Sequence, residues 1–522
     1  MKRKHPERFN PGDYTWLAFI FYVLLLGYAS LHHELWGDEV HSWNIAKGSG
    51  SYFDLIANRR YEGHPPAWHT LLWLISKCTH QVFYMQVAQW LIACSVVFLV
   101  LFRSPFALST RLLIPFGYYF LFEYGILSRN YALGVFFACW ICLIMRKEFR
   151  YRTILYYVLL FCLSNVHLLA MLLAASLHFY FLLLEVERKK SAKVIGAHIL
   201  GGILVLLPAI YFIIPPPDAE LSTPGLLHMW NIHQLTTFYE VPLRALLPLP
   251  AWWNLHFWNT QFLIGARSNP GWINPLVTAL LLSLVFFILR RSPKSTLLFF
   301  VNLLLNLAVS VTFYGLTTAR YTGFVYIGFI AAYWLFCSET ALAGQRTPPT
   351  GRHAPTTARH GYRLGSLYWA DLLLALQLPG GLFALYKDIR LPFSNMYQVG
   401  ALLAEVPPGD KWVTDYWTMN AIEAYIDQPA YCIDVHKNLS FVLWDGTMAA
   451  LQKTSNRYSA GLALLFKTDT IRSVYMISQS TLPMLLERDP GLSAAYRITL
   501  IDKREGAIEK GSNLYLYRID GP

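Results

Sequence analysis

Apolar runs recur along most of the chain, each separated from the next by a short polar connection. They cover residues 14–31, 82–102, 112–127, 131–145, 153–166, 168–184, 194–214, 273–289, 295–313, 321–337 and 365–385. A helix needs roughly 17–25 apolar residues to cross a bilayer, so most of these runs are long enough and a few are short. The pattern predicts a polytopic α-helical membrane protein with about eleven transmembrane helices, in which residues 14–31 are a signal anchor that is not cleaved.

Lysine and arginine are distributed unevenly between alternate connections. Clusters occur in one set, at residues 2–8, 103–111, 146–152, 188–193, 290–294 and 346–363. The other set carries only scattered cations. Because cytoplasmic loops are enriched in Lys and Arg, the sequence predicts a cytoplasmic N-terminus and places the C-terminal part outside the cytoplasm.

The longer polar segments divide the chain into a transmembrane domain, residues 1–385, and a C-terminal domain, residues 386–522. The first includes a first outer loop at 32–66, a second outer loop at 215–272 and a cytoplasmic linker at 340–363. The second alternates β-like runs (411–415, 430–435, 472–478, 494–501 and 512–518) with helical stretches, which predicts a small α/β domain.

Composition supports a membrane protein. Hydrophobic residues make up 55% of the chain and charged residues 14%, against about 25% charged in a typical soluble protein. The net charge of +12 could indicate a nucleic-acid partner. The basic residues lie in short clusters between apolar runs, however, so we predict contact with membrane lipids and no nucleic acid.

The first outer loop reads LHHELWGDEVHSWNIAKGSGSYFDLIANRRYEGHPPAWH. Gly37-Asp38 can begin a short helix that ends near Gly48, and Ser51 can cap a second helix that ends near Arg60. Pro65 and Pro66 suit the first turn of a third. An apolar side on these helices predicts that they lie in the interfacial plane and hold Asp38 at the membrane surface.

Isolated charges and histidines between the apolar runs all fall on the predicted outer face. They are Asp38, Glu39, Arg59, Arg60, His64, Glu123, Arg129, His167 and Arg320. The charge rule favours a shallow hairpin over residues 112–145, with Arg129 at the floor of an outward-facing cavity. For Arg129 an interfacial snorkelling role is an equal alternative, and His167 is more often a buried structural histidine than a ligand.

Three motifs resemble a known superfamily. Asp38-Glu39-Val40-His41 with the later His64-Pro65-Pro66 resembles the first-loop pattern of protein O-mannosyltransferases. Ser128-Arg129-Asn130-Tyr131-Ala132-Leu133 is similar to an Arg-x-Tyr-Ala segment of many bacterial members, and Ala319-Arg320-Tyr321 to their late Arg-Tyr element. Together they resemble the GT-C superfamily of membrane glycosyltransferases, which also includes the lipid A aminoarabinose transferase.

The resemblance implies a hexosyl or pentosyl transferase of the bacterial cytoplasmic (inner) membrane, with a periplasmic C-terminal domain. It would move a sugar from a polyprenyl-phosphate donor to a hydroxyl of a lipid, glycan or protein. A carboxylate can remove the acceptor proton, and arginines can neutralise the departing phosphate. The expected catalytic residues are Asp38, as general base, and Glu39, assisting it or binding metal. The expected phosphate-binding residues are Arg320, Arg129, Arg59, Arg60, His64 and Tyr321.

No cofactor is assigned. A divalent metal could bind at Asp38, Glu39, His41 and His64, but their spacing is not diagnostic. The alternative functions are a glycan ligase or polymerase that uses a diphosphate-linked donor, and a transporter or flippase for a lipid-linked glycan. The second outer loop and the C-terminal domain are expected to shape the acceptor site.

Overall fold

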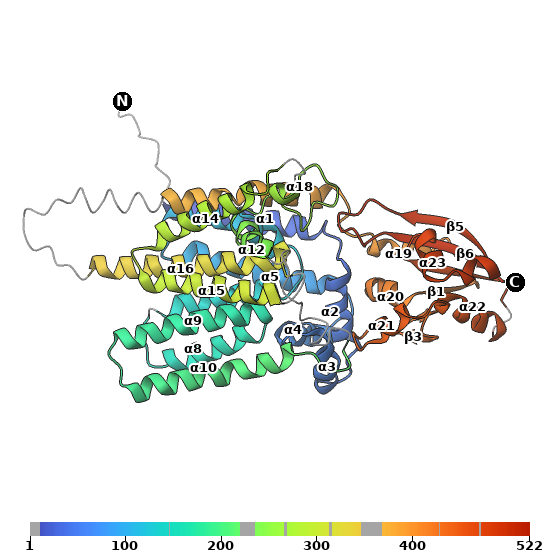
Figure 1. The fold of residues 1–522 in the computed structure, drawn as a ribbon, viewed down its shortest axis with the longest axis horizontal. Helices are drawn as coiled ribbons and strands as arrows, with labels where there is room; N and C mark the ends of the chain where they lie inside the picture. The colour runs from blue at the N-terminus through green and yellow to red at the C-terminus, as the bar shows by residue number, and fades with distance from the viewer. Residues whose placement is uncertain are drawn as a thin grey trace, which may run out of the picture.

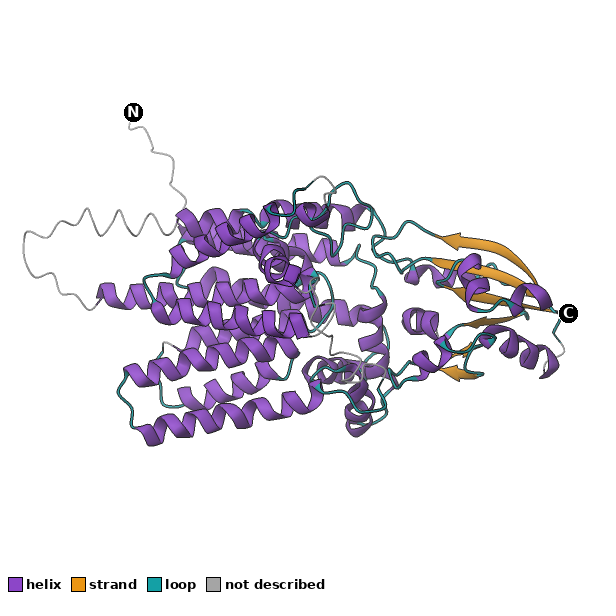
Figure 2. Cartoon of the chain, viewed as in Figure 1, coloured by secondary structure: helices purple, strands orange, loops and turns teal. Residues whose placement is uncertain are grey.

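A helical bundle and a domain built on a β-sheet lie end to end in the computed structural model (Figure 1). The structure describes residues 11–145, 147–219, 235–265, 269–312, 316–345, 368–426, 429–468 and 471–521. Among the described residues, all strands belong to the C-terminal domain (Figure 2). The predicted fold class, a polytopic helical protein with a small C-terminal α/β domain, is confirmed.

Seven helices of the described residues are long and apolar enough to cross a membrane. They are Gly12–Ser30 (within α1, Pro11–Ser30), Phe83–Arg103 (α5), Leu168–Glu187 (α9), Ala192–Ile213 (α10), Pro293–Thr312 (α15), Ala319–Thr340 (within α16, Ala319–Gln345) and Tyr368–Arg390 (which includes α18, Leu378–Arg390). Three shorter apolar helices are Tyr131–Met145 (α7), Arg152–Ser164 (α8) and Ile273–Leu289 (α14). These ten segments coincide with ten of the predicted apolar runs.

The remaining run, residues 112–127, is not one helix. It is divided among α6 (Leu108–Leu113), the turn of 3₁₀ helix η2 (Ile114–Phe116) and the turn of π-helix η3 (Tyr119–Glu123). Pro115 lies in η2 and Gly117 is extended, so neither continues a helix. The chain then turns through Ser128 and Arg129 into α7, which gives the predicted hairpin with Arg129 at its tip.

The first outer loop folds into a layer of short helices between the bundle and the C-terminal domain (Figure 1). They are α2 (Gly37–Gly48), α3 (Tyr52–Arg59), η1 (Arg60–Glu62) and α4 (Ala67–Ser76). The Ser51 side chain accepts a hydrogen bond from the Asp54 amide and caps α3, as its position predicted. Val40, Trp43 and Trp68 pack together in the core of this layer, which fixes α2 in place.

Part of the second outer loop belongs to the bundle. Helix α12 (Thr237–Leu246) packs against α14, α15 and α16 and buries Val241, Leu243 and Leu246. The short α13 (Phe262–Gly265) follows it. The predicted linker at 340–363 begins as helix, because α16 continues to Gln345, and residues 346–363 lie outside the described residues.

The C-terminal domain contains a six-stranded sheet of order β3-β2-β1-β4-β6-β5. The strands are β1 (Lys411–Thr414), β2 (Ala430–Cys432), β3 (Lys437–Leu439), β4 (Ser473–Ser478), β5 (Arg497–Arg504) and β6 (Leu514–Asp520). The β1 strand pairs in parallel with β2 and β4, and the other pairs are antiparallel. Five strands were predicted. The edge strand β3 was missed because it has only three residues, two of them polar.

Helices cover both faces of this sheet. Val474 and Met476 of β4 face the cluster that includes α22 (Arg457–Thr468), whereas Tyr475 and Ile477 face the cluster of α19 (Val399–Leu403) and α20 (Tyr416–Ile422). This is the alternation expected of a strand buried on both sides. The other helical segments are η5 (Met396–Gln398), η6 (Glu423–Tyr425), α21 (Thr447–Gln452), α23 (Leu482–Arg488) and α24 (Gly491–Ala495). Helix α18 ends at Arg390, slightly beyond the predicted domain boundary.

Candidate active site

The site is built on the first turn of α2, where Asp38 and Glu39 are neighbours. Acidic residues at a helix N-terminus are favoured by the helix dipole. A helix has 3.6 residues per turn, so the two side chains point in directions about 100° apart. The fold therefore gives each carboxylate a different environment.

The Glu39 side chain is completely buried and both of its oxygens are engaged. One oxygen accepts a hydrogen bond from the Ser128 amide; the other accepts one from the Trp36 amide at 3.0 Å and lies 3.2 Å from His33 Nε2. The other ring nitrogen of His33 is 3.0 Å from Asp388. Burial lowers the pKa of His33, but the Asp388 and Glu39 carboxylates outweigh it and raise this pKa well above its usual value. This geometry fits a positioning role for Glu39, not the predicted catalytic one.

The Asp38 carboxylate is 41% exposed and faces two arginines. Its Oδ2 lies 3.0 Å from Arg320 Nη1 and 3.9 Å from Arg129 Nη2. Arg129 also donates to the Asp38 carbonyl oxygen. Burial alone would raise the pKa of Asp38, but the Arg129 and Arg320 charges hold it below its usual 3.8. Asp38 is therefore an ionised, accessible carboxylate at neutral pH.

Aromatic rings hold the Arg320 guanidinium in place. Its carbon lies 4.9 Å from the ring centre of Tyr321, 5.1 Å from that of Trp36 and 5.8 Å from that of Trp258. Cations bind favourably to aromatic faces at such distances. Tyr321, predicted to bind phosphate, contacts the arginine through its ring. Trp258 shows that the second outer loop contributes to the site.

A second cationic group includes Arg59 and His64. Arg59 is completely buried and none of its three guanidinium nitrogens has a hydrogen-bond partner among the described residues. It contacts the Phe212 ring at 4.4 Å, and burial lowers its pKa to about 9. Burial, together with the Arg129 and Arg59 charges, lowers the pKa of His64 to about 4. Arg59, His64 and Arg129 are therefore within electrostatic reach of one another.

Arg60 does not join this group, contrary to the prediction that it binds phosphate. Its guanidinium donates to the Ile214 carbonyl oxygen and stacks over Tyr211 at 4.3 Å. His167 also has a structural role. It caps α9 through the Ala170 amide, and its ring packs against Phe324.

Three contacts of His41 were not anticipated from the sequence. Its Nε2 lies 2.6 Å from Glu62 Oε1 and 2.9 Å from the Trp444 indole nitrogen, and its Nδ1 contacts the Asn420 side chain. Burial lowers the pKa of His41, but the Glu62 carboxylate outweighs it and the net shift is upward. Glu62 could have been noticed, since it lies two residues before His64. Nothing local in the sequence connects His41 with Trp444 or Asn420.

The four residues considered for a divalent metal do not converge. Glu39 is turned toward His33 and Ser128, and His41 toward Glu62 and Asn420. No group of three or more His, Cys, Asp or Glu side chains in the described ranges is arranged to hold a metal ion. The geometry of these four side chains therefore does not fit a divalent metal held by all of them.

Comparison with solved structures identifies the architecture. The chain superposes on the crystal structure of ArnT from Cupriavidus metallidurans bound to undecaprenyl phosphate with a TM-score of 0.50, over 96% of this chain and 97% of that one. The chain has the fold of ArnT. Sequence identity with ArnT is 11%, so the likeness is one of fold. The likeness agrees with the expected architecture, a membrane helical bundle followed by a small C-terminal α/β domain. No protein-family model and no curated protein matches by sequence.

Proposed function

We propose that the protein is a glycosyltransferase that moves a sugar from a polyprenyl-phosphate donor to a hydroxyl acceptor at the membrane surface. One observation carries the proposal. An accessible carboxylate, Asp38, is held by Arg129 and Arg320 at the start of a helix that lies between the bundle and the C-terminal domain. The site thus combines a base with phosphate ligands. ArnT, which has the same fold, is described as bound to undecaprenyl phosphate.

The residues suit a direct displacement. The acceptor oxygen attacks the anomeric carbon and gives its proton to Asp38, while the bond from that carbon to the phosphate oxygen breaks. The electron pair leaves with the polyprenyl phosphate, whose charge Arg129 and Arg320 neutralise. Arginine forks bind phosphate oxygens well, so the donor competes with Asp38 for Arg320. When Arg320 turns to the phosphate, the pKa of Asp38 rises and the carboxylate becomes a stronger base.

Arg59 and His64 supply further capacity for anions. A buried guanidinium without hydrogen bonds is costly, and a phosphate would provide the missing acceptors. We place these residues deeper on the donor side and Arg320 nearest the reacting bond. Arg60 is left out of this set because it is bound to the carbonyl of Ile214.

The acceptor side is formed by segments that cover α2. Trp258 of the second outer loop packs on Trp36 with ring centres 4.8 Å apart. From the C-terminal domain, Trp444 reaches His41, and the half-exposed Trp417 packs on Trp444 with ring centres 5.7 Å apart. Aromatic faces of this kind can cover a lipid or stack on a sugar. We therefore propose that both segments orient the acceptor.

The Lys and Arg distribution supports a cytoplasmic N-terminus and a C-terminal domain outside the cytoplasm. We propose that the membrane is a bacterial inner membrane, as the family resemblance implies, and that the C-terminal domain is periplasmic. Alkaline phosphatase fused after Pro522 should be active and a fluorescent protein at the same position dark. Bright cytoplasmic fluorescence would overturn this orientation.

The function is tested with purified protein in liposomes and an undecaprenyl-phosphate-linked radioactive sugar. We expect release of undecaprenyl phosphate in the wild type and a loss of roughly 10²–10⁴-fold in Asp38→Asn, the usual contribution of a general base. Turnover restricted to diphosphate-linked donors would favour the ligase or polymerase. Movement of the intact lipid-linked sugar between leaflets without bond cleavage would favour a transporter.

A further inference from the structure

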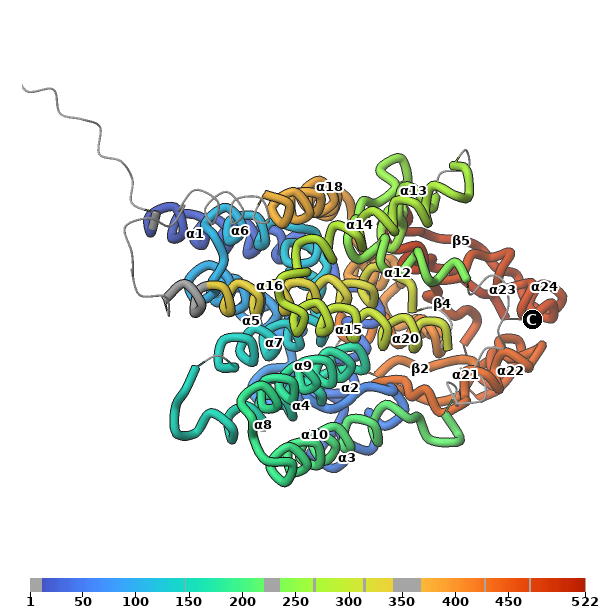
Figure 3. The backbone as a smooth tube through the Cα atoms, turned by 60° about the vertical axis from the view of Figure 1, so that its left-hand side comes forward, coloured from blue at the N-terminus to red at the C-terminus, as the bar shows by residue number. Residues whose placement is uncertain are grey.

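A groove runs along the bundle away from the candidate active site, between α5 and α7. The two helices pack side by side and run in the same direction (Figure 3). Both start near the site: Gln86 of α5 donates to the His33 carbonyl oxygen, and α7 follows Arg129. Both end at the opposite end of the bundle. The groove has a volume of about 700 Å³.

The lining forms two stripes, each of which ends in a cation. The stripe on α5 contains Leu91, Ser95, Phe98 and Arg103, and the stripe on and just beyond α7 contains Phe136, Trp140, Leu143 and Lys147. Leu91, Ser95, Leu99 and Arg103 follow at steps of four residues on α5, and the lining residues of the α7 stripe at steps of three or four, which keeps each stripe on one face. Phe19 of α1 adds a further apolar wall. Apolar surface therefore leads to a pair of positive charges.

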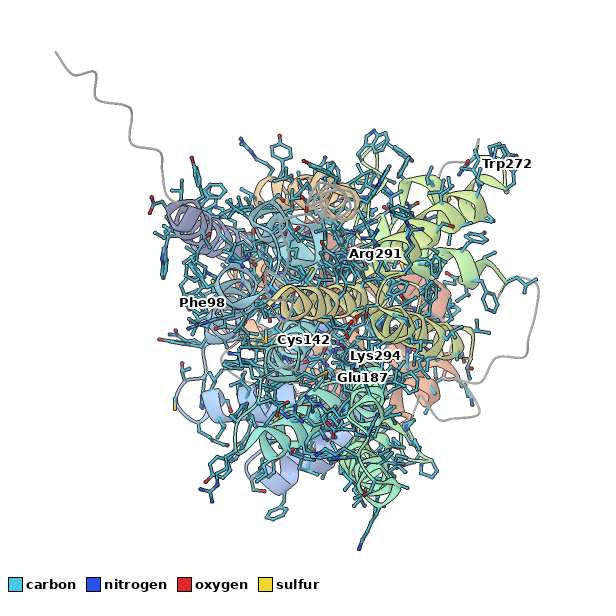
Figure 4. All side chains as sticks on the ribbon, turned by 90° about the vertical axis from the view of Figure 1, so that its left-hand side faces the viewer. Phe98, Cys142, Glu187, Trp272, Arg291 and Lys294 are labelled. Atoms are coloured by element: carbon cyan, nitrogen blue, oxygen red, sulfur yellow. The ribbon has the colours of Figure 1, made fainter. Side chains whose placement is uncertain are left out.

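The side chains of Arg103 and Lys147 make no hydrogen bond or ion pair with the part of the chain that the structure describes, and no carboxylate lines the groove. Two other cations at this end of the bundle are paired. Arg152 lies 2.9 Å from Glu148, and Lys294 forms an ion pair with Glu187 near the middle of the end face in Figure 4. Phe98 lies at the periphery in the same view. The groove is thus an apolar surface with unpaired positive charge at one end.

The length of the groove matches one leaflet. From Leu91 to Arg103 it follows about 18 Å of helix at about 1.5 Å per residue, whereas half of the hydrocarbon core measures about 15 Å. The cations then lie at headgroup depth in the leaflet opposite the active site, which the charge distribution predicts to be cytoplasmic. A chain of one leaflet's length, with an anionic head, fits this space.

We propose that this groove binds an anionic diacyl phospholipid from that leaflet. The acyl chains lie against Phe98, Trp140 and Leu143, and the phosphate lies between Arg103 and Lys147. Such a lipid would bridge α5 and α7 and thereby support the turn that carries Arg129. The inference does not depend on the transferase activity, because the groove and the active site are at opposite ends of α7.

Lipid binding is measured by native mass spectrometry and thermal unfolding of the full-length protein with added phosphatidylglycerol or phosphatidylcholine. We expect phosphatidylglycerol to bind and to raise the Tm, and phosphatidylcholine to do neither. In Arg103→Gln/Lys147→Gln the apparent affinity for phosphatidylglycerol should fall roughly 10- to 30-fold, since each cation near an anionic headgroup contributes to binding.

Two further variants make the test decisive. Arg150→Gln/Lys193→Gln removes two exposed cations from basic clusters at the same end of the bundle, neither of which lines this groove, and it should bind as the wild type does. Ser95→Trp fills the groove without changing charge, and it should lose binding even if the double glutamine variant misfolds. Equal losses in both glutamine variants, or no loss in Ser95→Trp, would overturn the proposal. Displacement of phosphatidylglycerol by undecaprenyl phosphate would assign the groove to the polyprenyl lipid instead.

Discussion

At the scale of single residues, Asp38 and Arg320 form an ion pair, and each is proposed to act on a different substrate group. Asp38 takes the acceptor proton, and Arg320 binds the donor phosphate. Their 3.0 Å contact keeps Asp38 ionised and holds Arg320 at the position where a donor phosphate would enter. The three rings around Arg320 limit how far it can move. A donor phosphate can therefore replace the Asp38 carboxylate as the partner of Arg320 with only a small movement of the arginine.

The lowered pKa of Asp38 gives a prediction about pH. The charged form is the active base, so kcat/KM should stay level as the pH falls until it approaches the lowered pKa, below 3.8. Arg320→Gln removes a stabilising charge, raises this pKa and moves the acid limb of kcat/KM to higher pH. Profiles of both proteins from acid to neutral pH test this. If the wild-type limb lies above about pH 5, or if the variant limb does not move, Arg320 does not control Asp38.

Arg59 gives a prediction in which stability and binding change in opposite directions. Its buried guanidinium has no hydrogen-bond partner, so Arg59→Met should leave the Tm of the donor-free protein unchanged or higher. The same change should weaken binding of undecaprenyl phosphate roughly tenfold or more, since charged hydrogen bonds contribute about 1.5–3 kcal/mol. Thermal unfolding and lipid binding are measured on the same preparations. Arg60→Met is the matched control and should leave the affinity unchanged. A fall in Tm without loss of affinity would make Arg59 structural.

At the scale of elements, the start of α2 is joined to the ends of distant segments. One Glu39 oxygen accepts a hydrogen bond from the Ser128 amide, in the turn before α7, and the other contacts His33, just after α1. His33 in turn contacts Asp388 of α18. This connection fixes Arg129 relative to Asp38, although the two residues are far apart in the chain. The same carboxylate accepts a hydrogen bond from the Trp36 amide at the N-terminus of α2, as the glutamate of a capping box does.

Glu39→Gln should separate this positioning role from catalysis. A glutamine amide would face the Ser128 or Trp36 amide donor with an N–H group, which costs about 1–3 kcal/mol for a buried unsatisfied group. We expect a lower Tm together with reduced kcat and a nearly unchanged pH profile. Asp38→Asn should reduce turnover without lowering the Tm. If Glu39→Gln loses turnover at an unchanged Tm, Glu39 takes part in the chemistry.

At the scale of the whole molecule, the sequence predicted those features that depend on local pattern. Hydropathy predicted ten of the bundle segments, and the charge rule predicted a hairpin over residues 112–145. The division of residues 112–127 into short helical turns was not predicted. Helix α12 was missed because Glu240, Pro242 and Arg244 interrupt its apolar residues. Convergence of Asp38, Arg129 and Arg320 was expected from three separate motifs. The His41–Trp444 contact could not be predicted from the sequence, because it depends on how the C-terminal domain packs against α2.

That docking changes how the role of the C-terminal domain should be tested. Asn44 donates to the Asn420 carbonyl oxygen, Lys47 lies 3.0 Å from Glu423, and Phe441 packs against Gly48 so closely that no side chain would fit there. Removing residues 386–522 would expose these buried groups on α2, the helix that carries Asp38. Deletion would therefore disturb the donor site as well as the acceptor site, and point substitutions are needed.

Trp444→Phe keeps an aromatic ring, smaller than the indole, and removes the indole N–H that lies 2.9 Å from His41 Nε2. If the domain orients the acceptor, donor hydrolysis by water should stay within about twofold of the wild type, because Asp38, Arg129 and Arg320 are untouched. Transfer into a detergent extract of the producing organism's membranes should fall roughly fivefold, the equivalent of one hydrogen bond of about 1 kcal/mol. Trp369→Phe, a half-exposed tryptophan of the bundle, is the matched control and should change neither rate. Equal losses of hydrolysis and transfer in Trp444→Phe would mean that the domain supports the donor site through His41, and the division between donor and acceptor sides of α2 would be wrong.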